Sequence, residues 1–184
     1  MEPWVARVIV RPMPRLAVIA LIAAQAAPPA VALAAQVGGP GPDHLVGGPG
    51  PDRISGRAGN DVIEGGAGND RLNGGRGDDR IVGGPGNDRL IGGQGNDLLA
   101  GDAGRDVLVG GPGADTLLGG AGSDRIDAAT PGDAGDIVVG GTGNDTIDAL
   151  DGSPDRISCG PGRDRVRADR GDRVSRDCEV VLRG

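Results

Sequence analysis

The chain has 184 residues, enough for one domain of modest size, and it carries a formal net charge of -7. Its 19 basic residues are all arginine, and an acidic chain of this kind argues against a nucleic-acid-binding protein. The 38 glycines and 14 prolines would suggest disorder if they followed no period.

The N-terminal segment has the features of an export signal peptide. Its basic stretch carries the arginines Arg7, Arg11 and Arg15, and an apolar run follows from Leu16 to Ala24. That run is too short to span a bilayer. The sequence Ala32-Leu33-Ala34 then has the small-x-small form of a cleavage site.

We therefore expect residues 1–34 to be a cleaved export signal and residues 35–37 to be a short linker. Because the lead before the apolar run is long for a signal, the true start is either Met1 or Met13. The protein is expected to be secreted or extracellular, with association at the cell surface left open. We expect no membrane span in the mature chain.

Ten consecutive nine-residue units occupy residues 38–127 without an insertion. In every unit the first and fourth residues are Gly, the sixth is Asp and the eighth is Leu or Ile. The second residue is also Gly except at Arg57 and Asp102, so the turns that carry Asp61 and Asp106 are expected to form poorer sites. The sixth-position aspartates are Asp43, Asp52, Asp61, Asp70, Asp79, Asp88, Asp97, Asp106, Asp115 and Asp124. The eighth-position residues are Leu45, Ile54, Ile63, Leu72, Ile81, Leu90, Leu99, Leu108, Leu117 and Ile126.

This order matches the pattern G-G-x-G-x-D-x-U-x, where U is a large aliphatic residue, and the chain resembles the RTX family of calcium-binding nonapeptide (hemolysin-type) repeats. The resemblance implies an all-β, right-handed parallel β-roll in which each repeat supplies a turn and a short strand, and two repeats form a coil of about 18 residues. It also implies several Ca²⁺ ions between stacked turns, bound by Asp carboxylates and turn carbonyls.

The residue types support this interpretation independently. Glycine permits positive φ angles and a close approach of the backbone to an ion, and Asp is a hard oxygen ligand that suits calcium better than zinc or copper. In a strand the eighth side chain faces one way and its neighbours the other. The Leu and Ile residues would therefore line a thin core.

If two repeats form one coil, each repeat stacks on the next but one. Asp43 then lies over Asp61, and the same relation continues along the array to Asp106 over Asp124. Stacked carboxylates would repel one another at close range and become ligands with calcium between them. Calcium would therefore control whether the domain folds.

The units become irregular between residues 128 and 175. A twelve-residue unit that begins at Ala128 contains an insertion at Ala129-Thr130-Pro131, and units of nine, ten, nine and eight residues follow. Whether Asp124 then pairs with Asp145, and Asp145 with Asp164, stays open. These units add the candidate calcium ligands Asp136, Asp145, Asp155 and Asp164.

Residues 176–184 drop the Gly pattern and are expected to form a C-terminal cap or tail. The chain has two cysteines, Cys159 and Cys178, and an even pair in an exported protein suggests a disulfide, with two free thiols as the alternative. Their separation is close to one coil, and strands stack about 4.7–4.9 Å apart, within the Cα spacing of a disulfide. The many arginines of residues 163–176 either form a basic patch for an anionic partner or pair with neighbouring aspartates.

Only metal-ligand chemistry is visible in the sequence. The single histidine, His44, occupies a variable seventh position, and there is no lysine. Neither an H-E-x-x-H site, nor a Ser-His-Asp triad, nor a phosphate-binding loop can be built from these residues. We therefore expect no enzymatic activity.

The sequence predicts an exported calcium-binding repeat protein with a structural or adhesive role. The alternative is a non-catalytic remnant or partner module of an exported hydrolase. An ice-binding or surface-binding roll would need a ladder of Thr on one face, whereas only Thr116 and Thr146 occupy seventh positions.

The two outer faces of the roll are expected to differ. The even repeats carry a row of arginines broken at Val107, whereas the odd repeats are more apolar around Val82, Leu98 and Leu118. A contiguous apolar patch often marks an interaction site. We expect this odd-repeat face to dock a cell-surface or protein partner or a second copy, the alternative being drift at unconstrained positions.

Overall fold

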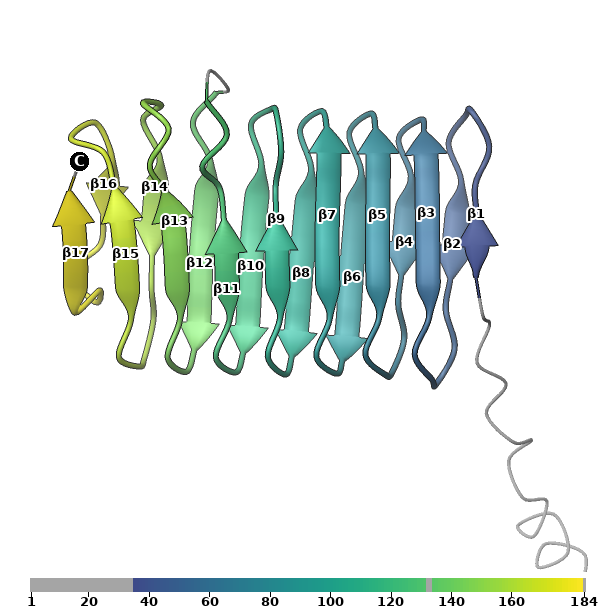
Figure 1. Ribbon diagram of the computed structural model, residues 1–184, viewed down its shortest axis with the longest axis horizontal. Coiled ribbons are helices and arrows are strands. Elements are labelled where there is room, and N and C mark those ends of the chain that lie inside the picture. Colours follow the sequence, from purple (N-terminus) through teal and green to yellow (C-terminus); the bar gives the residue numbers. More distant parts are fainter. Residues whose placement is uncertain (1–34, 132–133, 184) are drawn as a thin grey trace, which may run out of the picture.

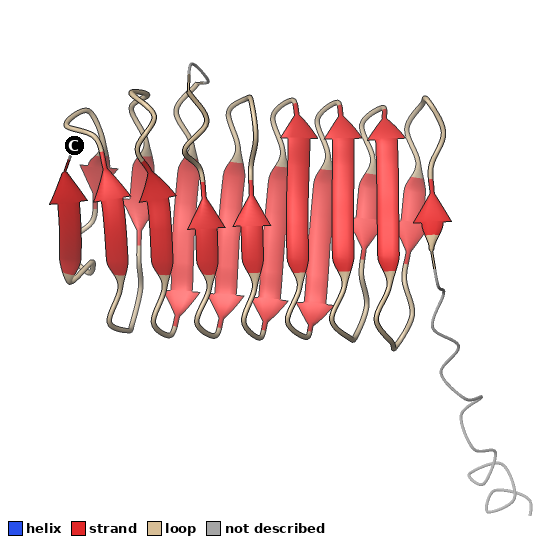
Figure 2. Ribbon diagram, viewed as in Figure 1, coloured by secondary structure: helices blue, strands red, loops and turns tan. Residues whose placement is uncertain are grey.

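Two parallel β-sheets face each other along the whole length of the molecule (Figure 1). A computed structural model describes residues 35–131 and 134–183, which contain strands and turns but no helix (Figure 2). The predicted export signal lies outside the described residues. No segment of the described part forms a helix that could cross a membrane.

The first sheet has nine strands, all paired in parallel with their neighbours. In spatial order they are β1 (Gln36–Val37), β3 (Arg53–Ala58), β5 (Arg71–Arg76), β7 (Arg89–Gln94), β9 (Val107–Val109), β11 (Arg125–Asp127), β13 (Thr146–Ala149), β15 (Arg165–Ala168) and β17 (Val180–Arg183). We call this sheet A.

The second sheet, sheet B, has eight strands, which are also parallel. They are β2 (His44–Val46), β4 (Val62–Glu64), β6 (Arg80–Pro85), β8 (Leu98–Ala103), β10 (Thr116–Ala121), β12 (Ile137–Thr142), β14 (Arg156–Ser158) and β16 (Arg173–Val174). The chain alternates between the sheets, so one strand from each forms a coil. The molecule is therefore a parallel β-solenoid of about eight coils, as the sequence predicted.

The core is a single layer of aliphatic side chains between the two sheets. The eighth residue of each unit points inward and packs on its counterpart one coil away, as in the register of Ile54 with Leu72 and of Ile63 with Ile81. Every eighth-position side chain from Ile54 to Val166 is at most 3% exposed. Leu45, at the N-terminal end, and Val174 and Val181, at the C-terminal end, are partly buried against this row.

The irregular units keep the same register, because the extra residues are absorbed in the turns. Leu117 pairs with Val138 across the predicted insertion, and Ile126 pairs with Ile147. The strands therefore align although the sequence separation has grown from 18 to 21 residues. A turn can lengthen in this way because its residues lie outside the hydrogen-bonded ladder.

From the fourth regular unit onward, glycine at the second position of a unit is favoured by the backbone. Gly66 and Gly84 have φ angles of 99° and 97°, and a Cβ atom on Gly66 would lie 2.2 Å from the carbonyl oxygen of Gly48. Arg57 and Asp102 occupy the same position with φ angles of 80° and 72°. These two residues adopt the left-handed conformation at a cost that Gly avoids.

Candidate calcium-binding turns

The candidate aspartates lie in the turns along the two long edges of the solenoid. We call the turns from sheet A to sheet B the upper edge and those from sheet B to sheet A the lower edge, as they lie in Figure 1. The upper edge carries Asp43, Asp61, Asp79, Asp97, Asp115, Asp136, Asp155 and Asp172. The lower edge carries Asp52, Asp70, Asp88, Asp106, Asp124, Asp145 and Asp164. All are at most 7% exposed except Asp43, which is half-buried in the first turn.

Each of these carboxylates from Asp61 to Asp172 accepts a hydrogen bond from the preceding coil through one of its oxygens. Oδ1 of Asp70 accepts a hydrogen bond from the backbone N–H of Asp52 at 2.8 Å, and Oδ1 of Asp79 does the same from Asp61. The contact repeats without a break from the Asp43–Asp61 pair to the Asp155–Asp172 pair, at 2.7 to 3.0 Å. The two edges therefore carry continuous columns of aspartates, one residue per coil.

The column runs through the irregular units as well. Asp124 donates its N–H to Asp145, and Asp145 donates to Asp164, at 2.9 and 2.8 Å. The stacking that the sequence left open beyond residue 127 is therefore present. The column also reaches Asp172, which the sequence did not indicate as a candidate ligand.

The second carboxylate oxygen of most of these residues is buried and has no hydrogen-bond partner. This holds for Oδ2 of Asp61, Asp70, Asp79, Asp88, Asp97, Asp106, Asp124, Asp145, Asp155 and Asp164. A buried carboxylate oxygen without a partner is costly. In a repeated native arrangement, such an oxygen indicates that a ligand completes the site.

In most units a glycine lies close to Oδ2 and to a carbonyl oxygen of the next coil. A Cβ atom on Gly65 would lie 2.6 Å from Oδ2 of Asp70 and 2.6 Å from the carbonyl oxygen of Gly83. The same relation joins Gly140 to Asp145 and to the carbonyl oxygen of Cys159, at 2.6 and 2.7 Å. A carboxylate and a carbonyl from the next coil thus converge beside a glycine.

This donor set fits calcium. Calcium takes several oxygen ligands from carboxylates and backbone carbonyls in flexible geometry. The described residues contain no group of three or more His, Cys, Asp or Glu side chains close enough to hold a metal together. Any ion would thus use carboxylates from successive coils and complete its shell with turn carbonyls.

The electrostatics of the columns favour a cation as well. Burial raises the pKa of Asp79, Asp88, Asp97, Asp106, Asp145 and Asp155 from 3.8 to about 6, opposed by the backbone hydrogen bond and assisted by neighbouring carboxylates. Burial also raises the pKa of Asp70 and Asp124. The columns therefore resist carrying their full negative charge unless a positive ion joins them.

A second ladder on the turns runs in the opposite direction. Asn69 Oδ1 accepts the N–H of Asn87, and Asn87 Oδ1 accepts that of Arg105, at 2.8 and 2.7 Å. These fifth-position side chains reach forward to the next coil, whereas the aspartates reach back to the preceding one. The repeat pattern leaves the fifth position variable, although Asn precedes Asp in five units.

The turns that contain Arg57 and Asp102 carry the same column contacts as their neighbours. Asp61 and Asp106 accept their backbone hydrogen bonds at 2.8 Å, and both are at most 1% exposed. The structure thus places these two carboxylates as it places the others. Whether the two turns bind calcium less well stays a prediction.

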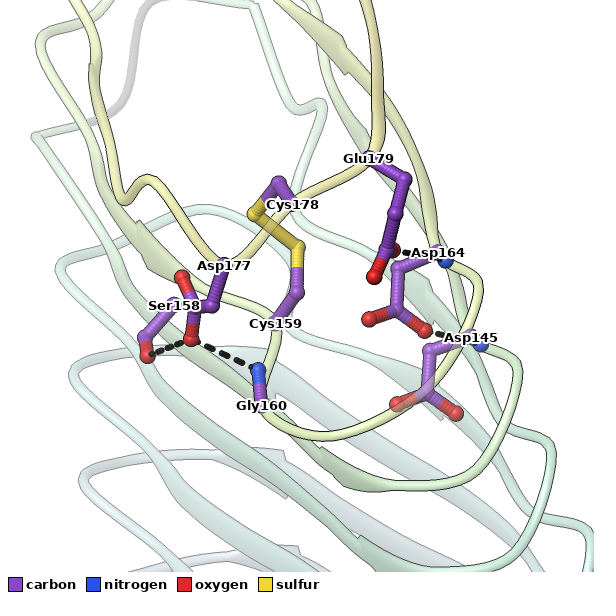
Figure 3. Close-up of a disulfide and its surroundings, with 8 residues drawn as sticks. All are labelled: Asp145, Ser158, Cys159, Gly160, Asp164, Asp177, Cys178 and Glu179. Carbon is purple, nitrogen blue, oxygen red and sulfur yellow. Dashed lines mark hydrogen bonds between the residues drawn. A yellow bond between two sulfur atoms is a disulfide. The ribbon is translucent and has the colours of Figure 1, made fainter.

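The C-terminal end is closed by side chains that the repeat pattern does not specify (Figure 3). The predicted disulfide joins Cys159 to Cys178 with a Cα–Cα distance of 5.2 Å. Asp177 Oδ2 accepts hydrogen bonds from the N–H of Gly160 at 2.8 Å and the hydroxyl of Ser158 at 3.1 Å. Hydrogen bonds, led by one from Ser175, lower the pKa of Asp177 to about 2.

The remaining polar residues singled out in the sequence lie on the surface. His44 contacts Glu64 through Nε2 at 3.5 Å, and both side chains are more than half exposed. Of the tail arginines, Arg167 forms an ion pair with Asp148 at 2.6 Å. This pair supports the interpretation of the tail arginines as partners of neighbouring acids.

Comparison with known protein families agrees with this geometry. A family model described as RTX calcium-binding nonapeptide repeat (4 copies) matches residues 37–72, 64–99, 73–108, 100–129 and 131–153. The matched segments cover more than half of the chain. A comparison with curated proteins gave no match.

Proposed function

Because the chain belongs to the RTX calcium-binding nonapeptide repeat family, we propose that it is a calcium-binding structural protein whose folded state depends on the ion. The observation that carries this proposal is the pair of aspartate columns. Each column holds buried Oδ2 atoms without hydrogen-bond partners beside carbonyl oxygens of the next coil. Calcium bound there would supply the positive charge that the stacked carboxylates need.

The proposed ligands are the sixth-position aspartates from Asp43 to Asp124, together with Asp136, Asp145, Asp155 and Asp164. Each lies in a turn between two coils and would share an ion with its neighbour in the column. The test is equilibrium dialysis of the purified protein against radioactive calcium. Saturable binding of several ions per chain supports the proposal, and binding of none contradicts it.

We further propose that the protein is exported and acts outside the cell without catalysis. The disulfide favours an oxidising compartment, and extracellular calcium reaches the concentrations at which weak calcium modules fill. The test is expression with the native N-terminus, followed by sequencing of the secreted chain. A mature N-terminus near Ala35 supports export. An uncleaved chain that remains inside the cell contradicts it.

The partner of the protein is proposed to bind the outer face of sheet B, which corresponds to the odd-repeat face. Val82, Ala100 and Leu118 lie side by side on this face, and Leu98 is beside Thr116 in the same register. Ile137, next along the face, is 44% exposed. This contiguous apolar surface supports an adhesive contact with a cell-surface partner or a second copy of the chain.

The variant Leu98→Arg with Leu118→Arg tests this contact, with Arg71→Glu on the outer face of sheet A as the control. We expect the parent protein to associate with itself or with isolated cell envelopes in calcium, and only the sheet B variant to lose this association. Light scattering measures the first kind of association, and sedimentation with envelopes measures the second. A monomeric parent that binds no envelope would contradict the contact. The alternative role, as a partner module of an exported hydrolase, predicts instead that the chain co-purifies with such an enzyme.

A further inference from the structure

The lower-edge column of acids does not end at Asp164. The backbone N–H of Asp164 donates a hydrogen bond to Glu179 Oε2 at 2.7 Å, as the N–H of Asp145 donates to Asp164 Oδ1 at 2.8 Å. In Figure 3 the carboxylates of Asp145, Asp164 and Glu179 follow one another along the edge. Glu179 therefore occupies the place of the repeat aspartate in the last coil.

A glutamate fits this place because the last turn is short. Nine residues separate the inward-facing Ile157 and Val166, whereas seven separate their counterparts Val174 and Val181. The loss of two residues changes the path of the turn, and the additional methylene of Glu gives its carboxylate a longer reach. The spacing from the acid to the following aliphatic residue, Glu179 to Val181, is the same as in the regular units.

The space beside Asp164 contains a second indication of a ligand. Asp164 is 1% exposed, and its Oδ2 is buried without a hydrogen-bond partner. An open hollow of about 540 Å³ is lined by Asp164 and Glu179 together with Asn144, Arg163 and Arg165. A buried, unpaired carboxylate oxygen beside a second carboxylate is the arrangement found all along the column.

The disulfide determines where Glu179 lies. Cys178 directly precedes Glu179, and Cys159 begins the turn that carries Asp164. Asp177 fastens the same segment to Gly160 and Ser158. The covalent bond therefore brings the last acid to the column, although the last turn lacks the glycines that shape the others.

We propose that Asp164 and Glu179 form a further calcium site, which closes the lower edge of the solenoid and is completed by the Cys159–Cys178 disulfide. This inference rests on the calcium binding proposed for the repeats, but it concerns residues beyond those that the family model matches. Arg163 and Arg165, which line the hollow, weaken the attraction for a cation. The site therefore fills after the sites of the regular array.

The test compares Glu179→Gln with Glu64→Gln, which removes the same charge from the exposed outer face of sheet B. Glutamine keeps a side-chain oxygen that can accept the N–H of Asp164, so the last coil is expected to fold. Equilibrium dialysis at saturating calcium is expected to show one ion fewer per chain in Glu179→Gln and no change in Glu64→Gln. Reduction of the disulfide is expected to remove one ion from the wild type and none from Glu179→Gln.

Equal calcium content in Glu179→Gln, Glu64→Gln and the wild type would overturn the terminal site while leaving the calcium-binding function intact. A wild type that binds no calcium would instead refute the proposed function. If Glu179 only accepts a hydrogen bond, Glu179→Gln binds as many ions as the wild type. If Glu179→Gln fails to fold, reduction of the disulfide in the wild type provides the test, and an unchanged ion count after reduction likewise overturns the site.

Discussion

The carboxylate of Asp97 uses one oxygen to hold two coils together and leaves the other without a partner. Oδ1 accepts the backbone N–H of Asp79 at 2.8 Å, whereas Oδ2 is buried and makes no hydrogen bond. The same side chain therefore serves the fold and the site. Removing its charge should weaken calcium binding while leaving the hydrogen bond between coils in place.

The first prediction concerns Asp97→Asn and its neighbour variant Asp78→Asn. Asp97→Asn keeps an oxygen for the Asp79 N–H but removes the charge that two adjacent sites share. We expect the calcium midpoint of folding to rise on the order of tenfold. Asp78 is exposed and accepts the N–H of Asn96, a role that Asn fills in other units, so Asp78→Asn should leave the midpoint almost unchanged. Equal midpoints for the two variants would remove Asp97 from the ligand set.

The second prediction concerns the strained second positions. Arg57 and Asp102 have positive φ angles where the other regular units have Gly. Arg57→Gly and Asp102→Gly should each stabilise the protein by about 1 kcal/mol in saturating calcium, because Gly adopts this conformation without steric cost. Denaturant unfolding measures the effect, and Arg76→Gly, at an exposed position with ordinary φ, is the control. A stability loss in Arg57→Gly as large as that in Arg76→Gly would contradict the strain argument.

The sequence determined most of the fold because two positions of the nonapeptide specify it. The sixth-position Asp locates the turn, and the eighth-position Leu or Ile locates the inward face of the strand. The pairing of Leu117 with Val138 could not be derived, because a turn can absorb three residues or shift the register, and the local sequence does not decide between them. The structure shows that the turn absorbs them.

The candidate site was predicted less completely than the fold. The repeat pattern identified the aspartate columns up to Asp164 but not their closure by Glu179, because the last unit lacks glycine and is two residues short. The only signal was the spacing from Glu179 to Val181. The Asn ladder, which reaches forward to the next coil, was missed because different short polar side chains can accept this hydrogen bond. The fifth position therefore shows no single recurring residue.

The third prediction concerns pH. Burial raises the pKa of Asp79, Asp97 and four other column residues to about 6, above the 3.8 of an exposed carboxyl. In the metal-free protein these groups bind protons more tightly when folded than when unfolded. Their contribution to stability is therefore complete below about pH 3.8 and is lost as the pH rises through about 6.

Protons also compete with calcium for these carboxylates. At a subsaturating calcium concentration, the number of bound ions should fall as the pH is lowered from 7.5 to 5, whereas the chelated protein should gain β-structure over the same range. Dialysis and circular dichroism measure the two effects. Calcium binding that stays constant over this range would contradict the assignment of the column carboxylates as ligands.

The fourth prediction concerns the disulfide. The Cys159–Cys178 bond closes a loop around the last coil, and its loss should lower the free energy of unfolding by about 3 kcal/mol in the chain-entropy model. The measurement is denaturant unfolding of the wild type and of Cys159→Ser with Cys178→Ser, both in saturating calcium. Adding a reductant should destabilise the wild type and leave the variant unchanged. Equal stability of the oxidised wild type and the variant would show that the bond does not hold the C-terminal end.

The dependence of folding on calcium is tested most directly by far-ultraviolet circular dichroism of the purified mature chain during a calcium titration that begins in chelator. We expect an unfolded spectrum in chelator, because buried carboxylates stacked one per coil repel one another without a cation. A cooperative change to a β spectrum should follow at calcium concentrations of about 10⁻⁴–10⁻³ M, and magnesium at the same concentration should produce a smaller change. A full β spectrum in chelator at neutral pH, unaltered by added calcium, would contradict this dependence.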